Sequence, residues 1–205
     1  MLFELDKKYQ ITHEWYHQLL NGYKVITEEP RAKKLVFDPA KQRTILEIGV
    51  YEGASTCWWS DNFLSHPDSR LYSIDPFTGN DEYKQNRASF PTLDHIEVIA
   101  RSNVAKSNNA GKVDIRKGCS WDLFPAVAQE LRAGVDILYV DGEHTSNAVV
   151  RDLSLYYPLL KSGGALILDD YGNEEVKKGV DGALSAFGKI ESAFFTGWQL
   201  WLVKA

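Results

Sequence analysis

The chain has 205 residues, of which 44% are hydrophobic, so it is long and apolar enough for one substantial domain with a buried core. The formal net charge of −5 and the scattered basic residues argue against a binder of duplex nucleic acid, which normally carries a basic stripe. No apolar run approaches the ~18 residues of a membrane span, and no secretory signal is visible at the N-terminus. Two cysteines, Cys57 and Cys119, form no disulfide framework, so we expect free thiols and a cytoplasmic protein.

Residues 1–40 differ in pattern from the rest of the chain. Aromatic and leucine residues, such as Trp15, alternate with charged ones, which predicts one or two amphipathic helices. We expect these helices to form a cover or lid near the ligand edge of the main domain, assigned to residues 41–205. His13 and His17 have a spacing that can hold a metal ion on one helix face. No third ligand lies nearby in the sequence, so two half-exposed polar side chains are the favoured interpretation.

The first predicted strand, residues 44–50, runs into a glycine-rich turn. Gly49 and Gly53 frame this turn, and a helix follows from Ala54. A strand, a glycine turn and a helix N-terminus let backbone N–H groups approach a ligand closely. The spacing lacks the G-x-G-x-x-G pattern of dinucleotide-binding folds, and a tight turn between strand and helix needs glycine whatever it binds.

A second short strand, residues 71–74, ends at Asp75. An acidic residue at this place in an α/β sheet can accept hydrogen bonds from both hydroxyl groups of a ribose, although simple turn chemistry explains it as well. Residues 81–110 predict two helical pieces separated at Pro91. Residues 112–117 predict a third strand because apolar and polar residues alternate in them.

The turn after this third strand leads into an amphipathic helix, which carries Leu123, Val127 and Leu131 on one face. The turn contains Ser120 and Trp121 and is well placed to meet an adenine. Trp121 is as compatible with a core position as with a stacking platform for a base.

Residues 135–171 carry the most informative pattern of the chain. Two apolar runs predict buried parallel strands with a helix between them. The first run ends at Asp141, and the second ends at Asp169 and Asp170. The glycines Gly163 and Gly164 mark the expected turn from the helix to the second strand, and the apolar stripe of the helix consists of Val149, Leu153, Tyr156 and Leu160.

Neighbouring parallel strands end roughly 5 Å apart, at the edge where ligands collect. Asp141, Asp169 and Asp170 would then share one small volume, where like charges repel unless they are protonated or bridged by a cation. Because consecutive strand residues point to opposite faces, we expect the strand to end at Asp169 and Asp170 to turn with the loop. Taken singly, each acid is also compatible with a strand end or a helix cap.

The last part of the chain completes one α/β domain. Residues 174–187 predict a helix, and residues 189–195 and 199–203 predict a terminal hairpin. No internal repeat and no second domain is visible in the sequence.

Four segments together resemble a known family. They are LEIGVYEGAST, LYSIDPFTG, VDILYVDGEHTSNAVVRDL and LLKSGGALILDDY. In this order they are similar to the class I S-adenosylmethionine-dependent methyltransferases, in particular the small metal-dependent O-methyltransferases of the macrocin type and, more distantly, catechol O-methyltransferase. The resemblance implies a Rossmann-like fold with a seven-stranded, mostly parallel sheet and a C-terminal antiparallel hairpin.

The resemblance also implies a binding site for S-adenosylmethionine. Asp75 would hold the ribose hydroxyls, Ser120 and Trp121 would lie by the adenine, and Asp141 would border the cofactor. The first strand and its glycine loop would hold the methionine part, through Glu47, Gly49, Val50, Tyr51, Gly53 and Ser55.

A metal site and a general base follow from the same resemblance. Asp141, Asp169 and Asp170 match ligands of a divalent cation, and their oxygen atoms suit Mg²⁺, or else Mn²⁺ or Ca²⁺. His144 stands where relatives place the general base. Glu143 matches an acidic residue with that role in some sugar-modifying relatives, so the choice of base stays open.

The implied function is O-methylation of a small hydroxylated acceptor, a sugar or a natural product. A hard divalent cation can bind two adjacent acceptor oxygens, orient one and lower its pKa, and an imidazole can take the proton near neutral pH. A nicotinamide-dependent oxidoreductase is an alternative that the missing glycine pattern disfavours. A non-catalytic module with the same cofactor pocket is a further alternative. We expect no nucleic-acid or membrane partner, and a homo-oligomer stays open.

Overall fold

The computed structural model describes residues 5, 7–79, 81–90, 92–187 and 189–205. Residues 1–4 and 6 of the expected cover segment, and Pro91, the expected helix break, lie outside the described residues. Among the described residues, no helix combines the length and the apolar character that crossing a membrane requires.

Within the described residues, seven strands form one sheet in the order β3-β2-β1-β4-β5-β7-β6. The five strands from β3 to β5 are parallel, and β7 and β6 join antiparallel as a hairpin at the end of the chain. The predicted fold class is therefore confirmed. The strands are β1 (Thr44–Ile48), β2 (Arg70–Asp75), β3 (Val113–Lys117), β4 (Val135–Val140), β5 (Leu160–Leu168), β6 (Ile190–Phe195) and β7 (Leu200–Lys204).

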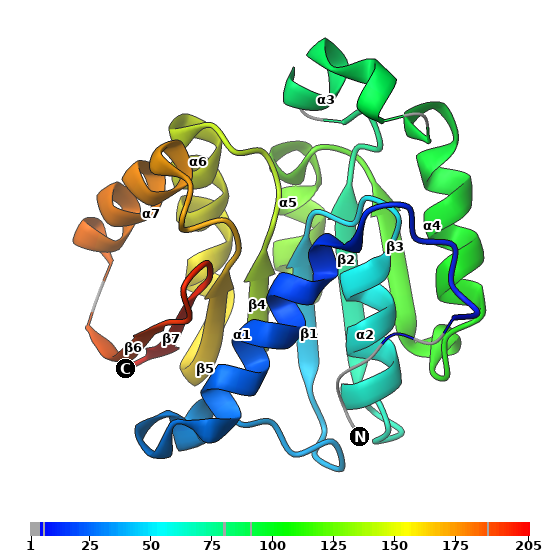
Figure 1. Cartoon of the computed structure of the whole chain (residues 1–205). Coiled ribbons are helices and arrows are strands. Elements are labelled where there is room, and N and C mark those ends of the chain that lie inside the picture. Colours follow the sequence, from blue (N-terminus) through cyan, green and yellow to red (C-terminus); the bar gives the residue numbers. More distant parts are fainter. Residues whose placement is uncertain (1–4, 6, 80, 91, 188) are drawn as a thin grey trace.

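Helices cover both faces of this sheet (Figure 1). Consecutive residues of a strand point to opposite faces. Leu138 and Leu166 accordingly pack with one group of helices, and Ile137 and Ile167 with the other. This double burial is the reason that the central strands are continuous apolar runs in the sequence. The first group is α5 (Ser120–Glu130), α6 (Ser146–Tyr156) and α7 (Glu174–Ala186), and the second is α1 (His17–Glu28) and α2 (Ala54–Phe63).

The segment between β2 and β3 lies beyond the edge of the sheet core. It forms helices on both sides of residue 91, as expected for residues 81–110, but the part before residue 91 consists only of short helical pieces. These are α3 (Asp81–Gln85), the 3₁₀ turns η3 (Arg87–Ser89) and η4 (Leu93–His95), and α4 (Ile96–Ala105). The remaining 3₁₀ turns are η1 (Glu14–Tyr16), η2 (Pro30–Leu35), η5 (Ala110–Lys112) and η6 (Tyr157–Leu159).

The N-terminal segment contributes to the core as well as to the ligand edge. Four side chains of α1 are buried in one cluster with residues of α2 and β7, and the ring of Tyr23 contacts those of Trp58 and Trp201. The backbone N–H of Phe37 donates to the Tyr23 hydroxyl at 2.9 Å, which ties the segment after α1 to the helix. This helix therefore acts as a structural layer, and the stretch before it approaches the carboxyl ends of the strands (Figure 1).

Two local expectations between α6 and β5 were wrong. Leu160 belongs to β5 and not to the stripe of α6, because Pro158 follows the last turn and cannot continue an α-helix. Gly163 and Gly164 lie inside β5 and form no separate turn. Gly163 has φ +76°, and the pairing register of β4 and β5 shifts here, so the two glycines form an irregularity within the strand.

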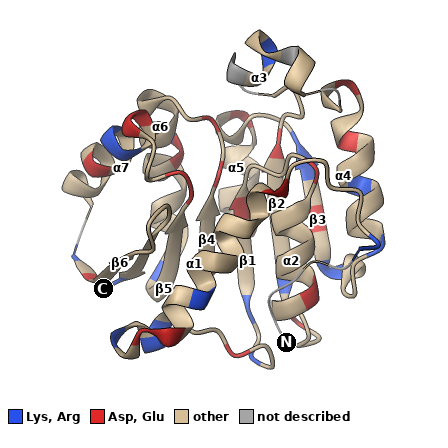
Figure 2. Cartoon of the chain, in the orientation of Figure 1, with Lys and Arg blue, Asp and Glu red and all other residues tan. Residues whose placement is uncertain are grey.

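Charged residues are distributed over many elements (Figure 2). In this view, the Lys and Arg residues of the described chain form no continuous stripe of the kind that binders of duplex nucleic acid carry.

Candidate active site

A cavity of about 600 Å³ lies at the carboxyl ends of the parallel strands. The loops after β1, β2, β3, β4 and β5 all reach it, and the stretch before α1 and the segment after β2 close it from the outside. Its size suits a small ligand, and its place is the one where doubly wound sheets bind ligands.

The glycine loop after β1 is held in an uncommon backbone conformation. Gly49 has φ +96°, and a Cβ atom on it would lie 1.7 Å from the carbonyl oxygen of Asp141. Only glycine allows β1 and β4 to approach so closely at this point. Tyr51 has φ +51°, which is rare for a residue with a side chain. The loop is therefore shaped by specific contacts and not by sequence propensity alone.

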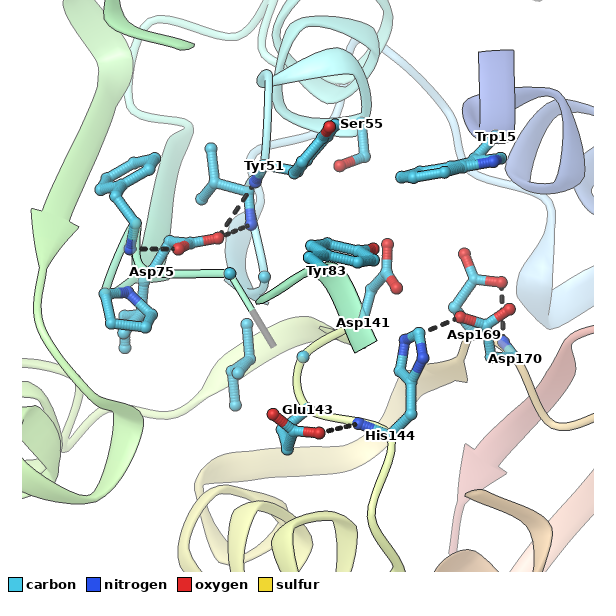
Figure 3. A pocket seen from close by; sticks show the side chains of 18 of the residues that line it. Trp15, Tyr51, Ser55, Asp75, Tyr83, Asp141, Glu143, His144, Asp169 and Asp170 are labelled. Carbon is cyan, nitrogen blue, oxygen red and sulfur yellow. Dashed lines mark hydrogen bonds and ion pairs between the residues drawn. The ribbon is translucent and has the colours of Figure 1, made fainter. Parts of the chain in front are cut away.

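Asp75 supplies these contacts at the end of β2. Its Oδ2 accepts from the backbone N–H groups of Val50 at 2.7 Å and Tyr51 at 3.0 Å, and its Oδ1 accepts from Phe77 at 2.6 Å (Figure 3). Burial raises the pKa of Asp75, and these three N–H groups counteract that rise. Asp75 lines the cavity, so its carboxylate both fixes the glycine loop and remains beside the ligand space.

Glu47 lies behind the cavity wall and not in it. Its side chain is fully buried and accepts hydrogen bonds from the hydroxyl groups of Ser55, Thr56 and Ser73, each at 2.6 Å. Burial raises the pKa of Glu47 to about 7, although the three hydroxyls oppose the shift. Glu47 therefore fixes the first turn of α2, and Gly53, the N-cap of that helix, is likewise absent from the described cavity wall.

The end of the cavity beside β3 contains both residues expected near an adenine. Ser120 donates to the carboxylate of Asp152, and its carbonyl accepts from the Tyr156 hydroxyl at 2.6 Å. Trp121 is 43% exposed, so it is not a core residue. The guanidinium of Arg151 lies 3.5 Å from the centre of the Trp121 ring, and this contact fixes one face of the indole.

Three side chains converge at the ends of β4 and β5. Asp141, His144 and Asp170 have ligand atoms within 4.8 Å of one another, a spacing that can hold a metal ion. Nε2 of His144 lies 2.9 Å from Oδ2 of Asp170 (Figure 3). Burial and the charges of Asp169 and Asp170 raise the pKa of Asp141 well above its usual value. Burial acts on Asp170 in the same direction, but His144 and Trp198 hold the pKa of Asp170 below its usual value.

Asp169, the third expected aspartate, lies beside this cluster and also lines the cavity. β5 ends at Leu168, one residue earlier than expected, and Asp170 turns into the loop with φ +52°. Asp169 is buried, and its Oδ2 accepts from the Tyr139 hydroxyl and from Nε2 of Gln199. The same Tyr139 hydroxyl donates to Oδ2 of Asp141 at 3.2 Å, so Tyr139 connects the two carboxylates. Burial and the neighbouring charge of Asp170 raise the pKa of Asp169 to about 6.

The two residues expected to act as base point in different directions. His144 points toward Asp170, whereas the Glu143 carboxylate is turned back to accept from the backbone N–H of His144 at 3.1 Å (Figure 3). Both residues line the cavity. The geometry places the imidazole, and not the carboxylate, beside the acidic cluster.

Aromatic side chains close the outer side of the cavity. His13 stacks on Trp15 and on Phe90, and Trp15 and Phe90 both stack on Tyr83. His17 lies outside this group, and its Nδ1 is 3.7 Å from a carboxylate oxygen of Glu14.

Several site residues were not identified from the sequence. The buried carboxylate of Glu52 accepts from the backbone and hydroxyl of Thr12 and from the hydroxyl of Thr92, and so joins both covering segments to the glycine loop. Tyr139, Asp152, Trp198 and Gln199 were also missed. The sequence pattern gave no signal for them, because each has a partner far away in the chain.

Comparisons with known proteins place this arrangement in a family. A family model described as a methyltransferase domain matches residues 46–171. The uncharacterized protein R132 of Acanthamoeba polyphaga mimivirus is 33% identical over 133 residues, which cover 62% of this chain. The chain spans about half of that relative, 51% of its length.

Solved structures share the fold at low sequence identity. The O-methyltransferase TomG from Streptomyces achromogenes, in complex with SAM, has a TM-score of 0.60 at 19% identity, over 90% of this chain and 79% of that chain. An O-methyltransferase from Bacillus cereus in complex with SAH has a TM-score of 0.59 at 17% identity, over 100% of both chains. The MycE methyltransferase of the mycinamycin biosynthetic pathway, in complex with Mg and SAH, has a TM-score of 0.57 at 18% identity, over 96% of this chain and 51% of that chain. With the family model matching more than half of the residues, the chain belongs to the methyltransferase-domain family.

Proposed function

We propose that this protein is an S-adenosylmethionine-dependent O-methyltransferase that uses a divalent cation and acts on a small hydroxylated acceptor, a sugar or a natural product. The observation that carries the proposal is the position of the Asp141, His144 and Asp170 cluster in the same cavity as the glycine loop. A methyl donor held by the loop and an acceptor held by the cluster would meet in one enclosed space.

The cofactor site is proposed from the residues that face the cavity. We assign the methionine part to the backbone of Gly49, Val50 and Tyr51 with Ser55, and the ribose to Asp75, because all of these residues line the cavity. The Asp75 carboxylate already accepts two hydrogen bonds on Oδ2 and one on Oδ1. A ribose hydroxyl would therefore donate to the acceptor position that is left on Oδ1. S-adenosylmethionine supplies an electrophilic methyl group. TomG and the Bacillus cereus enzyme, which share this fold, bind SAM and SAH.

The residues present also fit a divalent cation. Asp141 and Asp170 offer carboxylate oxygens, the donors that suit Mg²⁺ or Mn²⁺, and the imidazole of His144 lies next to them. Burial and then the charges of Asp169 and Asp170 raise the pKa of Asp141, and a cation would relieve the repulsion between these carboxylates. When bound, such an ion would orient an acceptor hydroxyl and lower its pKa. MycE, with the same fold, contains Mg.

His144 is the proposed general base. It lies beside Asp170, whose carboxylate orients the imidazole, and it faces the cavity. It would accept the proton of the acceptor hydroxyl when the oxygen takes the methyl group from the sulfonium and S-adenosylhomocysteine leaves. Glu143 is the alternative, but its carboxylate is bonded to the backbone of its own loop.

Calorimetry and methyl transfer test this proposal. S-adenosylhomocysteine should bind to the protein, and labelled methyl groups should pass from S-adenosylmethionine to a member of a panel of vicinal diols only when Mg²⁺ or Mn²⁺ is present. Binding without transfer to any acceptor would favour a non-catalytic module. Nicotinamide oxidation, measured by absorbance in the same samples, would favour the oxidoreductase, which the methyltransferase family match argues against.

A further inference from the structure

A buried carboxylate on α6 has no part in the function proposed above. Asp152 lines the cavity although its side chain is only 3% exposed. The Ser120 hydroxyl donates to its Oδ1, and Nε of Arg151 lies 3.9 Å from the same oxygen, beyond hydrogen-bond distance. Burying a carboxylate with so distant a cationic partner costs free energy of folding. A ligand that donates a hydrogen bond to Asp152 would offset this cost.

The second oxygen of this carboxylate is available. Among the described residues, Ser120 is the one hydrogen-bond donor seen for Asp152, and Oδ2 has no partner there. Oδ2 adjoins Gly142, where an added Cβ would lie 3.5 Å from it. Gly142 also lines the cavity and follows Asp141 at the end of β4. The free oxygen therefore lies between the loop after β4 and the turn after β3.

An aromatic side chain lines the same end of the cavity as Asp152. Trp121 presents an indole ring fixed by the guanidinium of Arg151 at 3.5 Å. Ser120 and Cys119 also line this end. A planar heterocycle bordered by these residues would present its edge to the wall that contains Asp152.

We propose that Asp152 recognises the exocyclic amino group of a 6-aminopurine, the adenine of the cofactor. This inference rests on the proposed function, which brings an adenosyl ligand to the cavity. An ionised carboxylate offers acceptor positions and no donor, and the adenine amine offers two donor hydrogens. A 6-oxopurine places a carbonyl oxygen at the same point, where the two acceptors repel each other. Ser120 holds Oδ1 and thereby aims Oδ2 at the base.

Purine discrimination distinguishes this role from a merely structural one. Calorimetry would compare S-adenosylhomocysteine with S-inosylhomocysteine, its 6-oxo analogue, on the wild-type protein and on Asp152→Asn. We expect the wild type to prefer the adenosyl ligand by about tenfold or more, because the 6-oxo ligand cannot donate a hydrogen bond from position 6 to the carboxylate. In Asp152→Asn the preference should fall to about threefold or less, because an amide can donate to the 6-oxo group as well as accept from an amine.

A ligand series on the wild type provides a second test that requires no variant. The purine analogue of S-adenosylhomocysteine with hydrogen at position 6 lacks the amine and should bind about tenfold more weakly. Equal binding of all three ligands to the wild type, or an unchanged preference in a folded Asp152→Asn variant, would overturn the assignment of Asp152. If S-adenosylhomocysteine itself gave no heat, the proposed function would fail first, so the two failures are distinguishable.

Discussion

Nε2 of His144 lies 2.9 Å from Oδ2 of Asp170, and this contact joins the loop after β4 to the loop after β5. It exists because β5 ends at Leu168 and Asp170 adopts φ +52°, which turns its side chain toward the cavity. Asp169, one residue earlier, also lines the cavity but is buried, and its carboxylate accepts from Tyr139 and Gln199. The two adjacent aspartates thus have different hydrogen-bond partners.

His144→Ala should lower kcat by about 100-fold or more, because positioned proton transfer contributes about that much. The affinity for S-adenosylhomocysteine should stay within about twofold of wild type. Glu143→Ala is the matched control from the same loop, and it should retain most of kcat because its carboxylate faces the backbone of the loop. Steady-state kinetics and calorimetry measure both quantities. A larger loss in Glu143→Ala than in His144→Ala would reverse the assignment of the base.

Asp170→Asn and Asp169→Asn should differ in their response to Mg²⁺. Asp170→Asn removes a carboxylate of the cluster, so stimulation by Mg²⁺ should be lost. Asp169→Asn changes a supporting residue, so half-saturation should move to about 10–100-fold higher Mg²⁺ with kcat largely recovered at saturation. Activity as a function of Mg²⁺ concentration separates the two outcomes. Full wild-type activity in excess EDTA would contradict the metal role altogether.

Glu52→Ala should loosen the covering segments. The variant leaves the backbone N–H and hydroxyl of Thr12 and the hydroxyl of Thr92 without their buried acceptor. We expect a loss of about 2 kcal/mol in the free energy of unfolding and faster proteolysis near residue 12. Glu52→Gln keeps one acceptor oxygen and should lose less. Equal stability of Glu52→Ala and wild type in urea would show that the contacts contribute little.

Gly22→Ala should destabilise the protein, although alanine normally stabilises a helix interior by about 1 kcal/mol relative to glycine. An added Cβ would lie 2.3 Å from Oε1 of Gln199, which is fully buried and accepts from Trp201 at 3.0 Å. Displacement of Gln199 should cost about 1–3 kcal/mol. Gly182→Ala is the control, because that helical position of α7 has nothing within 4 Å of an added Cβ and should be stabilised. Urea unfolding of both variants shows whether each substitution raises or lowers the free energy of unfolding.

The buried Glu47 should make stability depend on pH. Its pKa is raised from 4.5 to about 7 in the folded state, so between these values the folded protein binds more protons than the unfolded chain. Stability should therefore fall as pH rises from about 4.5 to 7, by on the order of 3 kcal/mol from this group. Glu47→Gln cannot ionise and should show a flatter profile over that range. Urea unfolding at each pH measures the free energy of unfolding of both proteins. If it changed with pH in the same way in wild type and Glu47→Gln, ionisation of Glu47 would not explain the pH dependence.

The sequence by itself determined the fold class and the order of the main elements. The central strands are apolar runs because both their faces are buried, and the glycine turn and the strand-end acids are local features that need no distant partner. Cavity-facing residues such as Gly49, Asp75 and Asp141 were found for this reason: in a parallel sheet, the residues after each strand share one edge.

Only the tertiary structure decided which of these residues face the cavity. Glu47 was expected to contact the cofactor, but three hydroxyls from α2 and β2 hold it behind the wall. The different contacts of Asp169 and Asp170 depend on the left-handed backbone conformation of Asp170. The hydrogen-bond partners of Asp169 come from β4 and the final hairpin. Side-chain direction at a strand end is set by the point where the strand stops and by donors far away in the chain, and neither is encoded in local periodicity.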